Sequence, residues 1–391
     1  MSFLSIPFAG SAIVDKRAYI RFLSRLCWTY ILIQDPLCAD ALAFWISKAT
    51  TLPLTIQLRI PDPFVDFDSI LSILGGAMHQ CVSFNFCIHP SMQDALRNFL
   101  RTIPPTRARF LSLTFSQPSQ KRTSTDFIAL ETALPALTFL RLFQATIHWI
   151  QTLDFSALTH LIFVNCAPEH SPSWNDFGVI SICAPNLTHA SFRLISCREL
   201  PFPHKAKVFP AWRHLQHFDL ELADNITIII LLTRMRFPAL RVFHLRLHTH
   251  YDFDDLLLCA PALSSVQELH ITLLNPPSVG WVAALLRTMP RISSVVIVQG
   301  YGQVFNALMD DASGALPCPA LSFVSTVAPA CKVRLFAETR LLMSDSLQSV
   351  GIRCSETEWD DADEDLQWLC SRISVVRLDR YIGPGWIWRL Y

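Results

Sequence analysis

Histidine is the residue type whose spacing in this chain comes closest to a pattern for metal chemistry. The segment HLRLHTH places His244, His248 and His250 at even intervals, which puts three imidazoles on one face if the segment is a β-strand. Such a face could hold zinc or copper. Strand residues four apart are separated by about 13 Å, however, so only His248 and His250, with Asp252 close by, could share one ion. We therefore predict no metal site.

Other side chains that commonly carry catalysis do not stand in an enzyme-like arrangement. The sequence has no G-x-S-x-G, H-E-x-x-H, P-loop or G-x-G-x-x-G motif. Its twelve cysteines are scattered, without a C-x-x-C pair, and favour a reducing compartment. The acidic run at residues 356–365 lacks the glycine and closing glutamate of a calcium loop, and indicates a solvated loop or helix start, or else a functional acidic patch. We predict no catalytic residue, no cofactor and no enzyme activity.

The charge and hydropathy of the chain limit its partners. The formal net charge is +0 with histidine neutral, so no long-range field of one sign attracts nucleic acid or an anionic membrane. No apolar run approaches the roughly 18 residues of a spanning helix, and the first residues lack the basic start of a signal peptide. Because 51% of residues are hydrophobic and 16% charged, we expect one continuous core. We predict a protein of the cytoplasm or nucleus, with no membrane and no nucleic-acid partner.

A hydrophobic phrase that recurs along the chain predicts the repeated elements that would position the polar side chains. It reads Leu-x-x-Leu-x-Leu, with Phe, Ile, Val or Ala in place of some leucines. Its first residue stands at 137, 158, 187, 215, 240, 266, 292, 321, 347 and 373, a mean step of about 26 residues, which is within the range of leucine-rich repeats. Alternating apolar residues at 54–58, 84–88 and 111–115 extend the series to about thirteen turns between residues 50 and 382.

These repeats predict a fold class and a division of the chain. Helices are expected at residues 18–34, 39–48, 67–78, 91–102, 252–259 and 278–289. Prolines stand two residues before the first residue of several phrases, where each would end a helix and lead into an extended strand. We predict an α/β leucine-rich-repeat solenoid, a horseshoe of about thirteen irregular repeats with a parallel sheet on the concave face and helices outside. Residues 1–49 are expected to form an N-terminal helical segment, and residues 50–391 the solenoid with a C-terminal cap.

The residues between the inner apolar positions of each strand are expected to face the concave side, because side chains alternate along a strand. The register places on that face Arg141, His160, Arg193, Asp219, Glu221, His244, Arg246, His248, His270 and Arg377, together with Phe139, Phe143 and Phe323. The polar members in the middle of the chain would lie on strands about 4.8 Å apart and form one patch. We predict that this patch contacts a protein ligand. The alternative is a solvated sheet face whose charges pair with one another.

The stretch that opens the repeats resembles a known family. Residues 44–58, FWISKATTLPLTIQL, are similar to the W-[IL]-x-[KR]-[AS]…PL-x-[IL]-x-L phrase of fungal F-box proteins with leucine-rich-repeat-like tails, through Trp45, Lys48, Pro53, Leu54, Ile56 and Leu58. The C-x-P-x-L starts at Cys183 and Cys259, and the variant at Cys318, are similar to the repeats of the same proteins. The resemblance covers about residues 20–382 and consists of a shared pattern of repeats.

The resemblance implies a substrate-recognition subunit of a cullin-type ubiquitin ligase, which holds a protein substrate on the concave face and docks a Skp-type adaptor at its N-terminus. Leu26, Cys27, Trp28 and Pro36 resemble a worn version of the phrase that closes an F-box, and they would contact the adaptor. The opening Leu-Pro-x-Glu of an F-box is absent before residue 50, so the segment is vestigial. A stand-alone leucine-rich-repeat scaffold without a ligase is the alternative.

Overall fold

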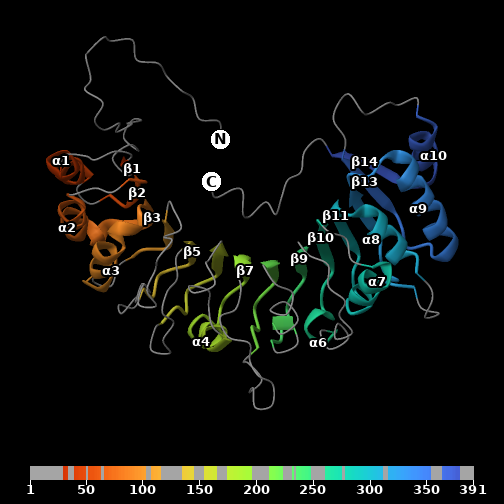
Figure 1. Cartoon of the computed structure of the whole chain (residues 1–391), viewed down its shortest axis with the longest axis horizontal. Helices are drawn as coiled ribbons and strands as arrows, with labels where there is room; N and C mark the ends of the chain where they lie inside the picture. Colours follow the sequence, from red (N-terminus) through yellow and green to blue (C-terminus); the bar gives the residue numbers. More distant parts are fainter. Residues whose placement is uncertain are drawn as a thin grey trace, which may run out of the picture.

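The fold is a single open sheet of parallel strands. A computed structural model describes residues 30–33, 39–49, 52–62, 66–102, 107–115, 134–144, 154–164, 174–195, 211–222, 231–232, 235–247, 260–274, 278–310, 316–353 and 363–378. In these ranges the 14 strands lie side by side in the order in which they occur in the sequence, and every neighbouring pair is parallel. The sheet curves into an arch with helices on its outer side (Figure 1). The predicted solenoid of the α/β class is confirmed.

The strands are short and evenly spread along the chain. They are β1 (Tyr30–Ile33), β2 (Leu54–Ile60), β3 (Cys81–Ile88), β4 (Phe110–Phe115), β5 (Phe139–Phe143), β6 (His160–Val164), β7 (His189–Ile195), β8 (His217–Leu222), β9 (Val242–Leu247), β10 (Glu268–Leu273), β11 (Ser294–Gln299), β12 (Phe323–Thr326), β13 (Ser349–Arg353) and β14 (Ser374–Leu378). Parallel neighbours need a crossover between them, so each strand belongs to a separate turn of the solenoid.

Helices supply many of these crossovers. They are α1 (Ala39–Ala49), α2 (Phe67–Ala77), α3 (Gln93–Thr102), α4 (Trp174–Cys183), α6 (Ala260–Leu263), α7 (Val279–Arg287), α8 (Tyr301–Leu308), α9 (Ala330–Met343) and α10 (Glu364–Arg372), with the 3₁₀ turns η2 (Met78–Gln80) and η3 (Pro90–Met92). The helices predicted at 39–48, 67–78, 91–102 and 278–289 are confirmed to within a few residues at their ends. The one predicted at 252–259 lies outside the described residues.

The first residue of the recurring phrase closes a hydrogen-bonded turn that leads into the strand. The amide of Leu137 donates to the carbonyl of Leu134 at 2.9 Å, across Pro135, and Leu240 bonds Phe237 in the same way at 3.1 Å across Pro238. Proline suits the second position of such a turn because its φ is already fixed. The later apolar residues of each phrase then enter the core from one side of the strand, as Leu220, Leu245 and Ile271 do on neighbouring strands.

The N-terminal helix predicted over residues 18–34 is wrong at its end. Residues 30–33 form β1, which pairs with β2 from Tyr30 opposite Thr55 to Ile33 opposite Leu58. The sequence YILI is apolar throughout, so it can be buried in a strand as well as in a helix, and the existing edge of β2 supplies hydrogen-bond partners. The sheet therefore extends to the N-terminal side of residue 50, where we expected the solenoid to begin.

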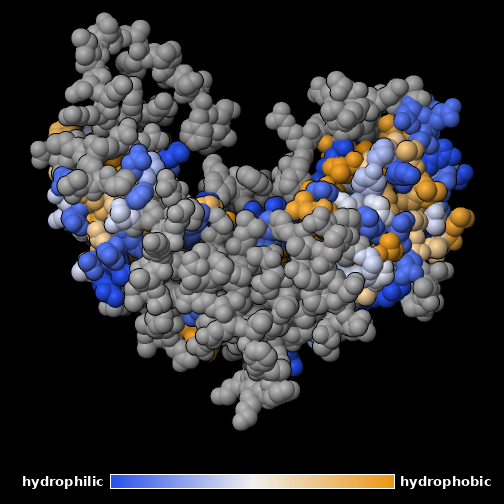
Figure 2. Space-filling view, viewed as in Figure 1, coloured by the Kyte–Doolittle hydropathy of each residue, from blue (hydrophilic) through white to orange (hydrophobic). Residues whose placement is uncertain are grey.

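The outer surface mixes polar and apolar side chains. On the C-terminal part of the arch, hydrophobic residues stand among hydrophilic ones (Figure 2). On α9, Leu335 and Leu342 are exposed hydrophobic side chains, and Leu342 is 89% exposed. In the part of the chain that the structure describes, none of the helices combines the length and hydropathy needed to cross a membrane.

Candidate functional site

The concave face carries three rows of side chains that run across the strands. Parallel pairing sets equivalent residues of successive strands side by side, and alternation along each strand leaves up to three on this face. We call them the first, middle and third rows, in chain direction. On β8 they are His217, Asp219 and Glu221. Because the helices cover the opposite side of the sheet (Figure 1), these rows line the inside of the arch.

Most of the predicted concave residues lie in these rows. His160 and Phe139 are in the first row with Phe323, while Arg141, Asp219, His244 and His270 are in the middle row, and Phe143, Arg193, Glu221 and Arg246 are in the third. His248 lies outside the described residues, as do the adaptor-binding candidates Leu26, Cys27, Trp28 and Pro36.

The placement of Arg377 on the concave face is wrong. Arg377 pairs with Ile352, which faces the core, whereas Val376 pairs with Gly351 of the middle row. A shift of one residue moves every side chain of a strand to the opposite face. Arg377 therefore stands on the helix side of the last strand.

A buried ion pair lies at the centre of the arch. Asp219 is 1% exposed, and its Oδ2 accepts hydrogen bonds from Arg193 Nε at 2.7 Å and Ser191 Oγ at 3.1 Å, besides a close contact with Arg193 Nη2. Its Oδ1 has no hydrogen-bond partner among the described residues. Removing either member of such a pair would leave the other charge buried and uncompensated, so this pair fixes β7 against β8.

Two further pairs continue along the neighbouring strands. Arg246 Nη1 donates to Glu221 Oε2 at 3.2 Å, and Glu268 contacts the Nε2 of His270. The hydrogen bond from His270 holds the pKa of Glu268 below its usual value. The charged side chains of this face thus pair with one another, which agrees in part with the predicted alternative of a solvated face with paired charges. The face is not uniformly solvated, however, because His244 is only 5% exposed and stacks on His270 with 3.8 Å between ring centroids.

The first row holds a stack of rings that our sequence reasoning missed. Five rings from consecutive strands stack on one another: Phe110, Phe139, His160, His189 and His217, with centroid distances of 4.5, 5.8, 4.2 and 4.3 Å. We call this the ring ladder. The signal was present in the sequence as Leu-Thr-His at 158–160 and 187–189 and as Leu-Gln-His at 215–217. The register placed Phe139 and His160 on the concave face, but the equivalent residues Phe110, His189 and His217 of the neighbouring strands were not included.

Threonines fix the tautomer of two histidines in the ring ladder. Thr159 Oγ1 donates its one hydrogen to the carbonyl of Thr138 at 3.0 Å and lies 2.8 Å from Nδ1 of His160. The hydroxyl can therefore only accept from His160, so Nδ1 carries the proton and Nε2 is the acceptor of the neutral ring. Thr188 and His189 repeat this geometry, at 3.0 and 2.9 Å.

The ladder histidines are held in their neutral form. Burial lowers the pKa of His160, and the charge of His217 lowers it further. Burial and the charges of His160 and His217 lower the pKa of His189 to about 3. For His217, burial also lowers the pKa, with Glu268 acting in the opposite direction. Stacked imidazoles repel one another when charged, so the stack needs neutral rings.

We expect the fold to lose stability as the pH falls from 7 to 5. Because the ladder histidines have lower pKa values in the folded state than in the unfolded chain, where histidine titrates near 6.5, acid protonates the unfolded state first. The contribution is complete above about pH 6.5 and is lost as the pH falls toward the folded-state values. Urea unfolding at several pH values measures the slope. The triple variant His160→Gln, His189→Gln, His217→Gln is expected to flatten it, whereas the exposed His79→Gln leaves it unchanged; equal slopes in both would contradict the assignment.

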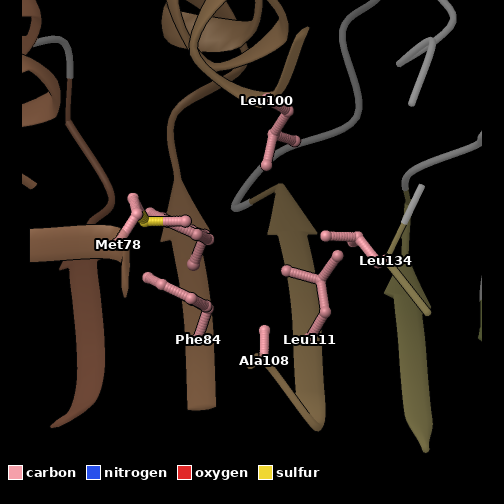
Figure 3. A pocket seen from close by; sticks show the side chains of 7 residues that line it. Met78, Phe84, Leu100, Ala108, Leu111 and Leu134 are labelled. Atoms are coloured by element: carbon pink, nitrogen blue, oxygen red, sulfur yellow. The ribbon is translucent and has the colours of Figure 1, made fainter. Parts of the chain in front are cut away.

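Metal ligands and cavities among the described residues also bear on what these rows can do. Within the described ranges, no three His, Cys, Asp or Glu side chains are grouped so that they could hold a metal ion. A small internal gap between β3, β4 and the end of α3 is lined by Met78, Phe84, Phe86, Leu100, Ala108, Leu111 and Leu134 (Figure 3). Since all of these side chains are apolar, the gap is a packing feature of the core and offers no group for chemistry.

Neither protein-family models nor curated protein sequences match the chain.

Proposed function

We propose that the chain is a recognition module that binds a protein partner on its concave face and does not act as an enzyme. The observation that carries this proposal is the open parallel sheet, whose rows place arginines, carboxylates and rings of many repeats side by side. The carboxylates at its centre are engaged by Arg193, Arg246 and His270. Such a surface presents a fixed, extended pattern of hydrogen-bonding groups, which suits recognition of another chain.

The proposal has two forms. In the first, implied by the resemblance to fungal F-box proteins, the chain is the substrate-recognition subunit of a cullin-type ubiquitin ligase. In the second it is a stand-alone scaffold. The strand β1 favours the second form, because residues 30–33 belong to the sheet and do not continue the last helix of an F-box. Gel filtration of the full chain mixed with a purified Skp-type adaptor separates the two: co-elution supports the receptor, and separate elution supports the scaffold.

The predicted polar patch in the middle of the concave face is expected to carry partner binding; it comprises Arg193, Asp219, Glu221, His244, Arg246, His248 and His270. Replacing Arg246 and His248 by alanine removes a guanidinium and an imidazole, and we expect binding of a captured partner to weaken about tenfold or more, the effect of losing one or two good polar contacts. Quantitative affinity capture with purified partner measures this, with Arg101→Ala and His79→Ala on the outer side as the matched control. Thermal melting checks that both variants fold. Equal capture by the two double variants would argue against the patch.

A further inference from the structure

The helix α9 is apolar on its outward face as well as on its inward face. Val333, Phe336 and Ala337 are buried against the core, whereas Leu335 and Leu342 are exposed. A surface helix is normally apolar on the side that meets the core and polar on the other side. The outward face of α9 therefore offers apolar area that a further contact would remove from water.

The two helices beside α9 do not share this character. Phe305 of α8 stacks on Phe336 of α9 with 4.5 Å between ring centroids, and Arg334 of α9 donates to Asp365 of α10 at 3.0 Å. Thus α9 lies between them on the outer side of the arch (Figure 1). The exposed residues of α8 are Gly302 and Asn306, and those of α10 are Glu364, Gln367, Cys370, Ser371 and Arg372. The exposed leucines therefore form a narrow stripe along α9.

This stripe is symmetric about the middle of the helix. Leu335 and Leu342 are seven residues apart, which is two helical turns and about 10 Å along one side of α9. Lys332, which is exposed, precedes Leu335 by three residues, and Asp345, also exposed, follows Leu342 by three. A half-turn about an axis perpendicular to the helix therefore places leucine on leucine and each charge opposite its counter-charge. An interface between two identical copies requires this self-complementarity.

The residue between the two leucines, Glu338, argues for a protein contact and against a lipid surface. Its Oε1 accepts a hydrogen bond from Arg334 Nε at 2.8 Å, and Arg334 also donates to Asp365. The carboxylate thus has a counter-ion within its own chain, so two such groups can lie near a two-fold axis. A helix that lies in a lipid surface keeps its charges away from its apolar side, whereas this stripe has a carboxylate at its centre.

We propose that the outward face of α9 binds the same face of a second copy of this chain, with the two helices antiparallel across a two-fold axis near Glu338. Leu335 of each copy packs on Leu342 of the other, and Lys332 of each copy meets Asp345 of the other. The antiparallel arrangement also sets opposite ends of the two helix dipoles side by side. A single helix pair buries less area than a standard interface, so we expect a transient dimer with a Kd of about 10 μM. The concave faces stay outside the contact, because α9 lies on the opposite side of the sheet (Figure 1).

Sedimentation velocity of the full chain from about 1 μM to about 300 μM measures this association. The unmodified chain should change from monomer to dimer within this range. Leu342→Glu introduces a carboxylate from each copy into the contact, and we expect it to weaken association by about a hundredfold or more. Ile182→Glu is the matched control, because Ile182 is an exposed residue of α4 and the same change there should leave the dimer intact. Thermal melting checks that both variants fold.

A charge swap tests the antiparallel register. Lys332→Glu alone and Asp345→Lys alone each bring like charges together, and each is expected to weaken the dimer about tenfold. The double variant Lys332→Glu, Asp345→Lys restores opposite charges across the two-fold axis and should recover most of the loss. Both side chains are exposed, so the melting temperature should stay the same in all three variants.

Several results would overturn the proposal. A monomer at every concentration would do so, as would a dimer that Leu342→Glu leaves unchanged. A double charge variant that dimerises no better than the single variants would contradict the antiparallel pairing. Binding to vesicles of phosphatidylcholine and phosphatidylserine, lost in Leu342→Glu and without self-association, would assign the stripe to a membrane surface instead. Partner capture through Arg246 and His248 does not depend on any of these results, so the proposed function is tested separately.

Discussion

Replacing Leu245 by aspartate is expected to unfold the central repeats. Leu245 is 1% exposed and pairs with Leu220 on one side and Ile271 on the other, all within the core. The change removes a large apolar side chain and introduces a carboxylate without a partner, so we expect a loss of about 4 kcal/mol or more in the free energy of unfolding. Because each turn of a solenoid is stabilised by its neighbours, the loss should spread to both sides.

Urea unfolding and amide hydrogen exchange measure these two effects. Strands β8 and β10 are expected to lose protection together with β9. Leu274→Asp is the matched control, since this leucine is 39% exposed just after β10 and the same chemical change should cost less than about 1 kcal/mol. If the two variants unfold at the same urea concentration, the stacked core described above is not what stabilises the fold.

The spacing of apolar residues predicted most of this fold because each repeat obeys the same local rule. A turn before the strand and alternation within it can both be read from a single repeat, as with Leu134–Leu137 and the strand that follows. The rule gives less information at the ends of the array. In β14 two consecutive valines, Val375 and Val376, allow either register, and only pairing with β13 shows that Val375 lies opposite Val350.

The chemistry of the concave face was harder to predict than its location. The sequence predicted that Asp219 and His244 lie on the concave face, but their burial depends on side chains from strands roughly 25 residues away in the chain. The ring ladder likewise exists only because phenylalanine or histidine occurs at the same register in five neighbouring repeats. A search for equivalent polar residues at one register position, repeat by repeat, would have found His189 and His217.

Replacing the buried Arg340 in the C-terminal repeats is expected to give the second large loss of stability. This arginine of α9 is 0% exposed, and its guanidinium donates to the carbonyl oxygens of Leu308 at 2.7 Å, Pro317 at 3.1 Å and Cys318 at 2.5 Å. Leu308 is the last residue of α8, where carbonyls lack helical partners and the helix dipole is negative. Cys318 has a φ of 50°, in the left-handed region. One side chain therefore joins a helix end to a strained turn.

Arg340→Met keeps the length of the side chain but removes its donors. The three carbonyls would remain buried, and each unsatisfied group costs about 1–3 kcal/mol, so we expect the free energy of unfolding to fall by about 4 kcal/mol. Arg340→Lys keeps the charge without the planar fork and should give an intermediate loss. The control is Arg334→Met on the same helix, whose partners Glu338 and Asp365 are partly exposed, so we expect a much smaller loss because exposed ion pairs contribute little to stability. Urea unfolding distinguishes them: similar midpoints for Arg340→Met and Arg334→Met would mean that the buried guanidinium does not hold these repeats together.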